Sequence, residues 1–167
     1  MKNNTDYPAA MPWFLTISWG WIVVASIIES VLQSIFHKPL PLILNVLIIW
    51  RFVQAAWLLK VDRRSQAIYW LVAGSLLDLL NTFVPILHRA HVGLIIYAII
   101  EISVVIAGIF VFRRDMLRYF NEVDDTGLTL SPWMSLFFNT IYFQYHFNVI
   151  AELNMQQSLK FSLSQSK

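Results

Sequence analysis

Four long apolar stretches, separated by short polar breaks, constrain the fold of this chain more than any other feature. They cover residues 12–36, 40–59, 66–87 and 93–112. Each has the length of about 20 residues that an α-helix needs to cross a bilayer. The short breaks favour antiparallel neighbours. The sequence therefore predicts an all-α integral membrane protein, with a four-span antiparallel transmembrane helix bundle in residues 1–114.

Composition agrees with a bilayer environment and argues against several classes of function. Hydrophobic residues make up 57% of the chain and charged residues only 13%, against about 25% charged residues in soluble domains. The absence of cysteine excludes disulfides and thiolate-bound metals. The sequence also lacks an HExxH motif, a glycine-rich phosphate loop and a GxSxG motif. We therefore expect no enzyme, no cofactor and no nucleic-acid partner.

Histidines in the third break raise one metal-site alternative. His88 and His91 have a spacing that metal ligands use. Loop histidines at a membrane edge are, however, commonly interfacial residues without a metal. We therefore predict no metal site.

Basic residues mark one side of the predicted bundle. Cytoplasmic ends of membrane helices carry an excess of lysine and arginine. One side collects Lys2, Lys60, Arg63, Arg64, Arg113, Arg114 and Arg118. The opposite side has Lys38 and Arg89. This bias predicts a multi-pass protein of the plasma (inner) membrane with both termini in the cytoplasm.

The chain changes character after the fourth stretch. Residues 115–130 read as a cytoplasmic helix extension and loop. Ser131 and Pro132 then form a typical helix start, and an aromatic side alternates with a polar side through residues 131–154. This pattern predicts an amphipathic helix lying in the membrane interface. A fifth span stays open as the alternative, because residues 131–151 carry no formal charge. Residues 155–167 are expected to form a disordered tail.

Each predicted span carries one ionisable residue well inside it. These residues are Glu29, Arg51, Asp78 and Glu101. A central charge costs about 2.5–3.5 kcal/mol on insertion scales, and all four lie about 10–16 Å from the outer end of their spans. We therefore expect them to converge on one shared interior site. Polar residues on the same helix faces would complete this site: Ser26, Ser30, Gln33, Gln54, Asn81 and Tyr97.

Two functions remain open for such a site. In the first, the buried Glu/Asp/Arg network only holds the bundle, and the protein is a non-enzymatic accessory, assembly or immunity-type membrane component. In the second, the chain is a small proton- or cation-coupled transporter or channel subunit, because three acids facing one arginine leave room for a proton or a small cation. The expected partners are the lipid bilayer and either another protein or a second copy of this chain.

Overall fold

The fold is built from helices throughout the part of the chain that the structure describes. The computed structural model describes residues 11–36, 45–83, 91–122 and 126–165, which contain no strand. A short 3₁₀ helix, η1 (Trp13–Thr16), precedes five α-helices. These are α1 (Trp19–Phe36), α2 (Val46–Val61), α3 (Ala67–Phe83), α4 (His91–Glu122) and α5 (Pro132–Gln165). The predicted all-α class is confirmed.

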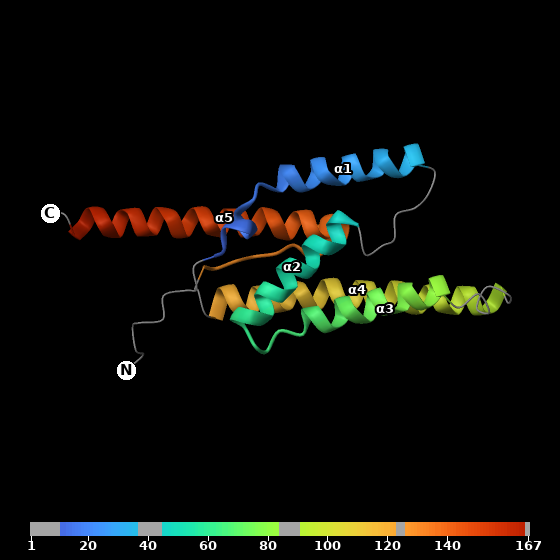
Figure 1. Ribbon diagram of the computed structural model, residues 1–167. Helices are drawn as coiled ribbons and strands as arrows, with labels where there is room; N and C mark the ends of the chain where they lie inside the picture. The colour runs from blue at the N-terminus through green and yellow to red at the C-terminus, as the bar shows by residue number, and fades with distance from the viewer. Residues whose placement is uncertain (1–10, 37–44, 84–90, 123–125, 166–167) are drawn as a thin grey trace.

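Helix α2 lies at the centre of the arrangement. Figure 1 shows α1 beside α5 and α3 beside α4, with α2 crossing obliquely between the two pairs. It is in contact with each of the other four α-helices. The two pairs are therefore joined through α2 and also by the direct contact of α4 with α5.

The hydrophobic core sits at one end of the bundle. It is formed by the second halves of α2 and α4, the start of α3 and the middle of α5. Its centre is aromatic: Trp57 packs edge-on against Tyr119 and Phe147, and Phe112 packs against Phe143 at a ring distance of 4.6 Å. Residues 115–130, predicted as a cytoplasmic helix extension and loop, contribute four apolar side chains to this core. These are Met116, Tyr119, Phe120 and Leu130.

One described helix is long and apolar enough to cross a membrane. This stretch is Ile95–Glu122 in α4. The apolar helices Trp19–Ile35 and Ala67–Leu80 are shorter. Helix α2 has only 16 residues, because Asn45 caps it and fixes its start at Val46. The described residues thus hold one candidate span, and four complete spans stay a prediction.

Helix α5 differs from the expected interfacial helix in two respects. It continues to Gln165, so the segment expected to be a disordered tail from residue 155 is helical. Its polar side faces inward, since Gln144 is buried while Phe137 and Tyr145 on the aromatic side are exposed. The helix contacts η1, α1, α2 and α4. Regular polar spacing correctly marked a separate face, but that face packs against protein rather than facing water.

The aromatic core gives a direct stability prediction. Phe147 is fully buried against Trp57 and Phe120, so Phe147→Ala removes packing and leaves a cavity. We expect a loss of about 3–5 kcal/mol of unfolding free energy, measured by denaturant titration of the detergent-solubilised chain. Phe137→Ala on the same helix is the control, because Phe137 is 73% exposed and its truncation opens no cavity. Equal losses for the two variants would contradict this location of the core.

Candidate functional site

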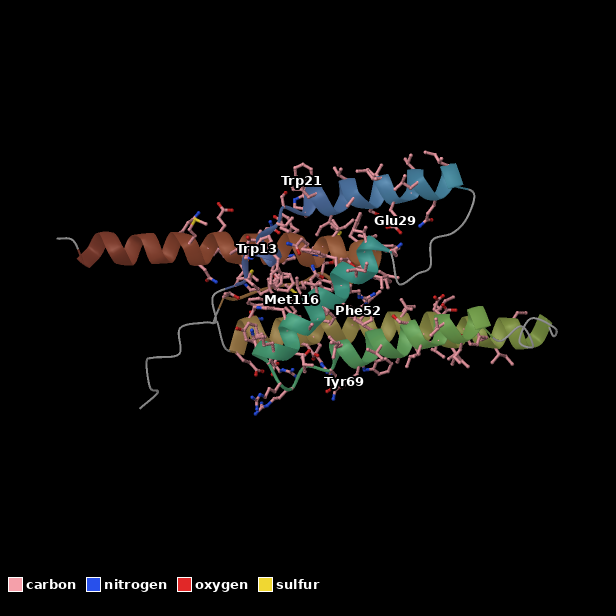
Figure 2. The ribbon with its side chains drawn as sticks, in the orientation of Figure 1. Trp13, Trp21, Glu29, Phe52, Tyr69 and Met116 are labelled. Carbon is pink, nitrogen blue, oxygen red and sulfur yellow. The ribbon has the colours of Figure 1, made fainter. Side chains whose placement is uncertain are left out.

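Glu29 belongs to α1, and its carboxylate lies at the first residue of α2. Figure 2 shows it on the side of α1 that faces α2, and its Oε2 accepts a hydrogen bond from the backbone N–H of Val46 at 2.9 Å. Its Oε1 accepts from Gln33 Nε2 at 3.0 Å. The N-terminal N–H groups of a helix have no partner within the helix, and the helix dipole favours an anion there. Glu29 therefore neutralises and anchors the start of α2.

Arg51 is the buried polar residue with the fewest partners. It is 8% exposed, and its Nε and Nη2 donate no hydrogen bond to any group that the structure describes. Nη2 lies 3.8 Å from the position that a Cβ of Gly108 would occupy. The missing side chain at Gly108 thus leaves space for the guanidinium between α2 and α4. None of the ion pairs formed by the described residues includes Arg51.

Asp78 and Glu101 form a second acidic location, between α3 and α4. The Glu101 carboxyl is close enough to Asp78 for their like charges to repel each other. Nearby, the Tyr97 hydroxyl donates a hydrogen bond to the carbonyl oxygen of Leu77 and joins α4 to α3. Two neighbouring carboxyls favour sharing a proton or binding a cation.

The four residues predicted to share one site thus lie in three places. Glu29 is at the start of α2, Arg51 is between α2 and α4, and Asp78 and Glu101 are between α3 and α4. Val46, the partner of Glu29, precedes Arg51 by five residues, or about 7 Å along α2. Gly108, the neighbour of Arg51, follows Glu101 by seven residues, or about 10 Å along α4. The three acids therefore lie toward one end of the bundle and Arg51 lies deeper. The prediction of a common depth measured each ionisable residue from the outer end of its apolar stretch. It did not take into account that α2 begins only at Val46, later than its apolar stretch.

The remaining predicted site residues have different positions. Gln33 accompanies Glu29 as expected, whereas Ser30 donates to the Ser26 carbonyl oxygen at 2.9 Å on an exposed face of α1. Both serines line a shallow groove along α1 that Ile141 of α5 closes. Asn81 belongs to α3, but its side chain lies outside the described part of the structure.

Gln54 belongs to a polar cluster around Gln144 of α5. Gln144 Oε1 accepts hydrogen bonds from Trp50 Nε1 at 2.8 Å and from Gln54 Nε2 at 2.9 Å. Its Nε2 donates to the carbonyl oxygens of Leu15 at 2.7 Å and Ile17 at 2.8 Å. One fully buried amide therefore joins α5 to α2 and to the irregular segment around η1. Gln144 lies on the polar side of the predicted amphipathic helix, and an interfacial position of that helix would turn this side toward water.

Asp115 is a second buried polar centre that the sequence did not reveal. It lies on α4 and is fully buried. Its Oδ2 accepts hydrogen bonds from Ser65 Oγ at 3.0 Å, and from the backbone N–H groups of Gln66 at 2.7 Å and Ala67 at 3.2 Å. Asp115 thus caps α3 in the way that Glu29 caps α2. In the sequence it lies in the segment predicted as a cytoplasmic helix extension, and its position directly after two arginines gives no sign of this burial.

Two arginines of α4 complete the surroundings of Asp115. Arg114 lies 3.0 Å and Arg118 lies 3.6 Å from Asp115 Oδ1. Arg118 also donates to Asp62 Oδ2 through Nη2 at 2.6 Å and Nε at 3.1 Å. These contacts join the α2–α3 loop to α4. Arg114 and Arg118, which the charge bias assigns to the predicted cytoplasmic side, therefore also hold the helices together.

The chemistry available to these groups is limited. The residues that the structure describes contain no group of three His, Cys, Asp or Glu side chains able to hold a metal. Comparison with protein-family models, with curated proteins and with solved structures finds no significant match to any of them.

Removing the Asp115 carboxylate should strongly destabilise the fold. Asp115→Ala leaves two backbone donors of α3 and the neighbouring arginines without their acceptor, so we expect a loss of about 3–5 kcal/mol. Chemical denaturation followed by circular dichroism measures this loss. Glu122→Ala, at an exposed acid of the same helix, should stay within about 0.5 kcal/mol of the wild type. A small effect at Asp115 would show that water replaces its hydrogen bonds.

Proposed function

We propose that this protein is a multi-pass component of the plasma (inner) membrane. The support is a belt of exposed aliphatic side chains on the second halves of α1 and α3 and the first half of α4. Members of the belt include Ile27, Ile28, Val31, Ile35, Leu76, Leu79, Leu80, Ile95, Ile96, Ile99 and Ile102. Soluble monomers rarely expose large apolar patches of the kind that these side chains form on each of the three helices. Lipid acyl chains solvate such patches without cost.

The charge distribution supports an orientation for this membrane protein. Lys60, Arg63 and Arg64 are exposed around the connection between α2 and α3. In Figure 1 this connection and the C-terminal end of α4 lie at the same end of the bundle, opposite the aliphatic belt. Basic residues concentrate on the cytoplasmic side of membrane proteins. We place this end, and both termini, in the cytoplasm.

Within the membrane we propose a non-enzymatic accessory or assembly role, in which the protein binds another membrane protein. The observation that carries this proposal is that Arg51 Nε and Nη2 are buried and have no hydrogen-bond partner among the residues that the structure describes. Glu29, Asp115 and Gln144 are each used to join helices. A buried charge without a partner is costly, so a bound acidic group would stabilise the Arg51 region.

The surroundings of Arg51 allow a partner to reach it. Trp70 packs on Gly108, with its Cβ 3.4 Å from the position of a Gly108 Cβ. Trp70 is 36% exposed, so the guanidinium lies about one side chain from the surface of the bundle. Arginine recognises carboxylates through two parallel N–H donors. An aspartate or glutamate in a partner helix would supply the missing acceptor.

Copurification from native membranes tests the accessory role. Tagged wild-type protein should recover a defined membrane partner, and Arg51→Gln should lose at least about tenfold of it because the charge-assisted hydrogen bonds are gone. Glu101→Gln is the matched control, since Glu101 lies away from Arg51 and should retain the partner. Recovery of no partner by the wild type would overturn the role. Equal recovery with Arg51→Gln would overturn the assignment of Arg51.

The proximity of Asp78 and Glu101 favours a second candidate, the proton- or cation-coupled transporter or channel subunit. In this case Asp78→Asn and Glu101→Gln should each abolish pH-dependent flux while the protein is still expressed and folded. Flux is measured in proteoliposomes with an internal pH dye, and empty liposomes give the background. A wild-type protein with no flux above that background would exclude this candidate.

A further inference from the structure

A groove lies between η1 and α2, separate from Arg51. It has a volume of about 410 Å³ and is lined by Pro12, Phe14, Val53, Ala56, Trp57, Lys60 and Val61. The five residues from α2 have the i, i+3, i+4, i+7, i+8 spacing of one helical face. The groove therefore follows the axis of α2 over about 12 Å.

Apolar and charged groups are separated along this groove. Lys60 is the one charged residue in its lining and stands near the end of α2, while the other lining residues are apolar. The exposed Arg63 and Arg64 follow in the loop beyond it. The groove thus combines an apolar floor with a positive end.

The positive end has no counter-ion within the described residues. The nearest acid in sequence is Asp62, but Arg118 holds its carboxylate at 2.6 Å. The ion pairs of the described residues include neither Lys60 nor the two loop arginines. Lys60 at the end of an apolar groove, with two exposed arginines shortly after it in the chain, is complementary to an anion that carries a hydrocarbon chain.

We infer that this groove binds an anionic phospholipid. One acyl chain lies on the apolar face of α2 against Phe14, and the phosphate lies between Lys60 and the loop arginines. The inference rests on the membrane location proposed above and is independent of the partner bound at Arg51. A basic residue near an anionic lipid surface contributes about 1 kcal/mol to binding, so Lys60 should give preference for the anionic headgroup. The apolar face should hold the chain of any phospholipid.

The test uses the full chain in detergent micelles and native mass spectrometry to count bound lipids. The probes are phosphatidylglycerol and phosphatidylcholine with identical acyl chains. The wild type should retain one phosphatidylglycerol more tightly than phosphatidylcholine. Lys60→Gln should lower the affinity for phosphatidylglycerol about fivefold and leave phosphatidylcholine unchanged. Lys160→Gln, the same charge change near the end of α5, should leave both affinities unchanged.

A second variant tests where the acyl chain lies. Ala56 is exposed in the groove, so Ala56→Leu fills the space without clashing in the core and should weaken the binding of both lipids. Unchanged binding with this variant would overturn the groove as the site. Equal retention of the two lipids by the wild type, or equal effects of Lys60→Gln and Lys160→Gln, would also overturn the inference. Alkaline extraction of native membranes tests the location separately, because a soluble chain is released by it.

Discussion

The need to satisfy the backbone N–H groups at the starts of two internal helices determines much of this architecture. In apolar surroundings no water is present to accept these hydrogen bonds. A carboxylate from a neighbouring helix meets the need in both cases: Glu29 of α1 at the start of α2, and Asp115 of α4 at the start of α3. Each acid is at once a cap, a counter-charge for the helix dipole and a contact between helices. Because α2 touches every other α-helix, fixing its start relative to α1 helps to hold the two helix pairs together, alongside the direct contact of α4 with α5.

The two ends of the bundle have different physical characters. At one end, aromatic side chains from α2, α4 and α5 form the core, and the buried amide of Gln144 joins them to the segment around η1. At the other end, α1, α3 and α4 bury few side chains and expose large aliphatic ones. Burial of apolar area stabilises the first end in any solvent. The second end gains comparable stability only from lipid or from another protein.

The sequence predicted the parts of this arrangement that depend on local pattern. The apolar stretches correspond to helices, Glu29 and Gln33 share one site, and Arg51 is buried. To predict whether all four ionisable residues converge, one must know where each helix begins. The starts of the helices depend on caps that distant segments of the chain supply. Asp115 is such a cap, and no local pattern distinguishes it from a surface aspartate beside arginine. The sequence identifies the polar side of α5. Whether that side faces water or protein depends on how α2 and η1 pack against the helix.

The proposed function depends on the difference between buried polar groups that already have hydrogen-bond partners and those that do not. A purely structural network should leave its members satisfied, because each buried group without a partner reduces the stability that the network provides. The carboxylate of Glu29, the carboxylate of Asp115 and the amide of Gln144 meet this condition. Gln54 meets it in part, because its Nε2 donates to Gln144 while its buried Oε1 has no partner among the described residues. Arg51 does not, although Glu29 and Glu101 are within two helical turns of its level. Its donors are held away from these acids by the same contacts that hold the bundle together. A guanidinium without an ion pair among the described residues is therefore suited to an acid supplied from outside.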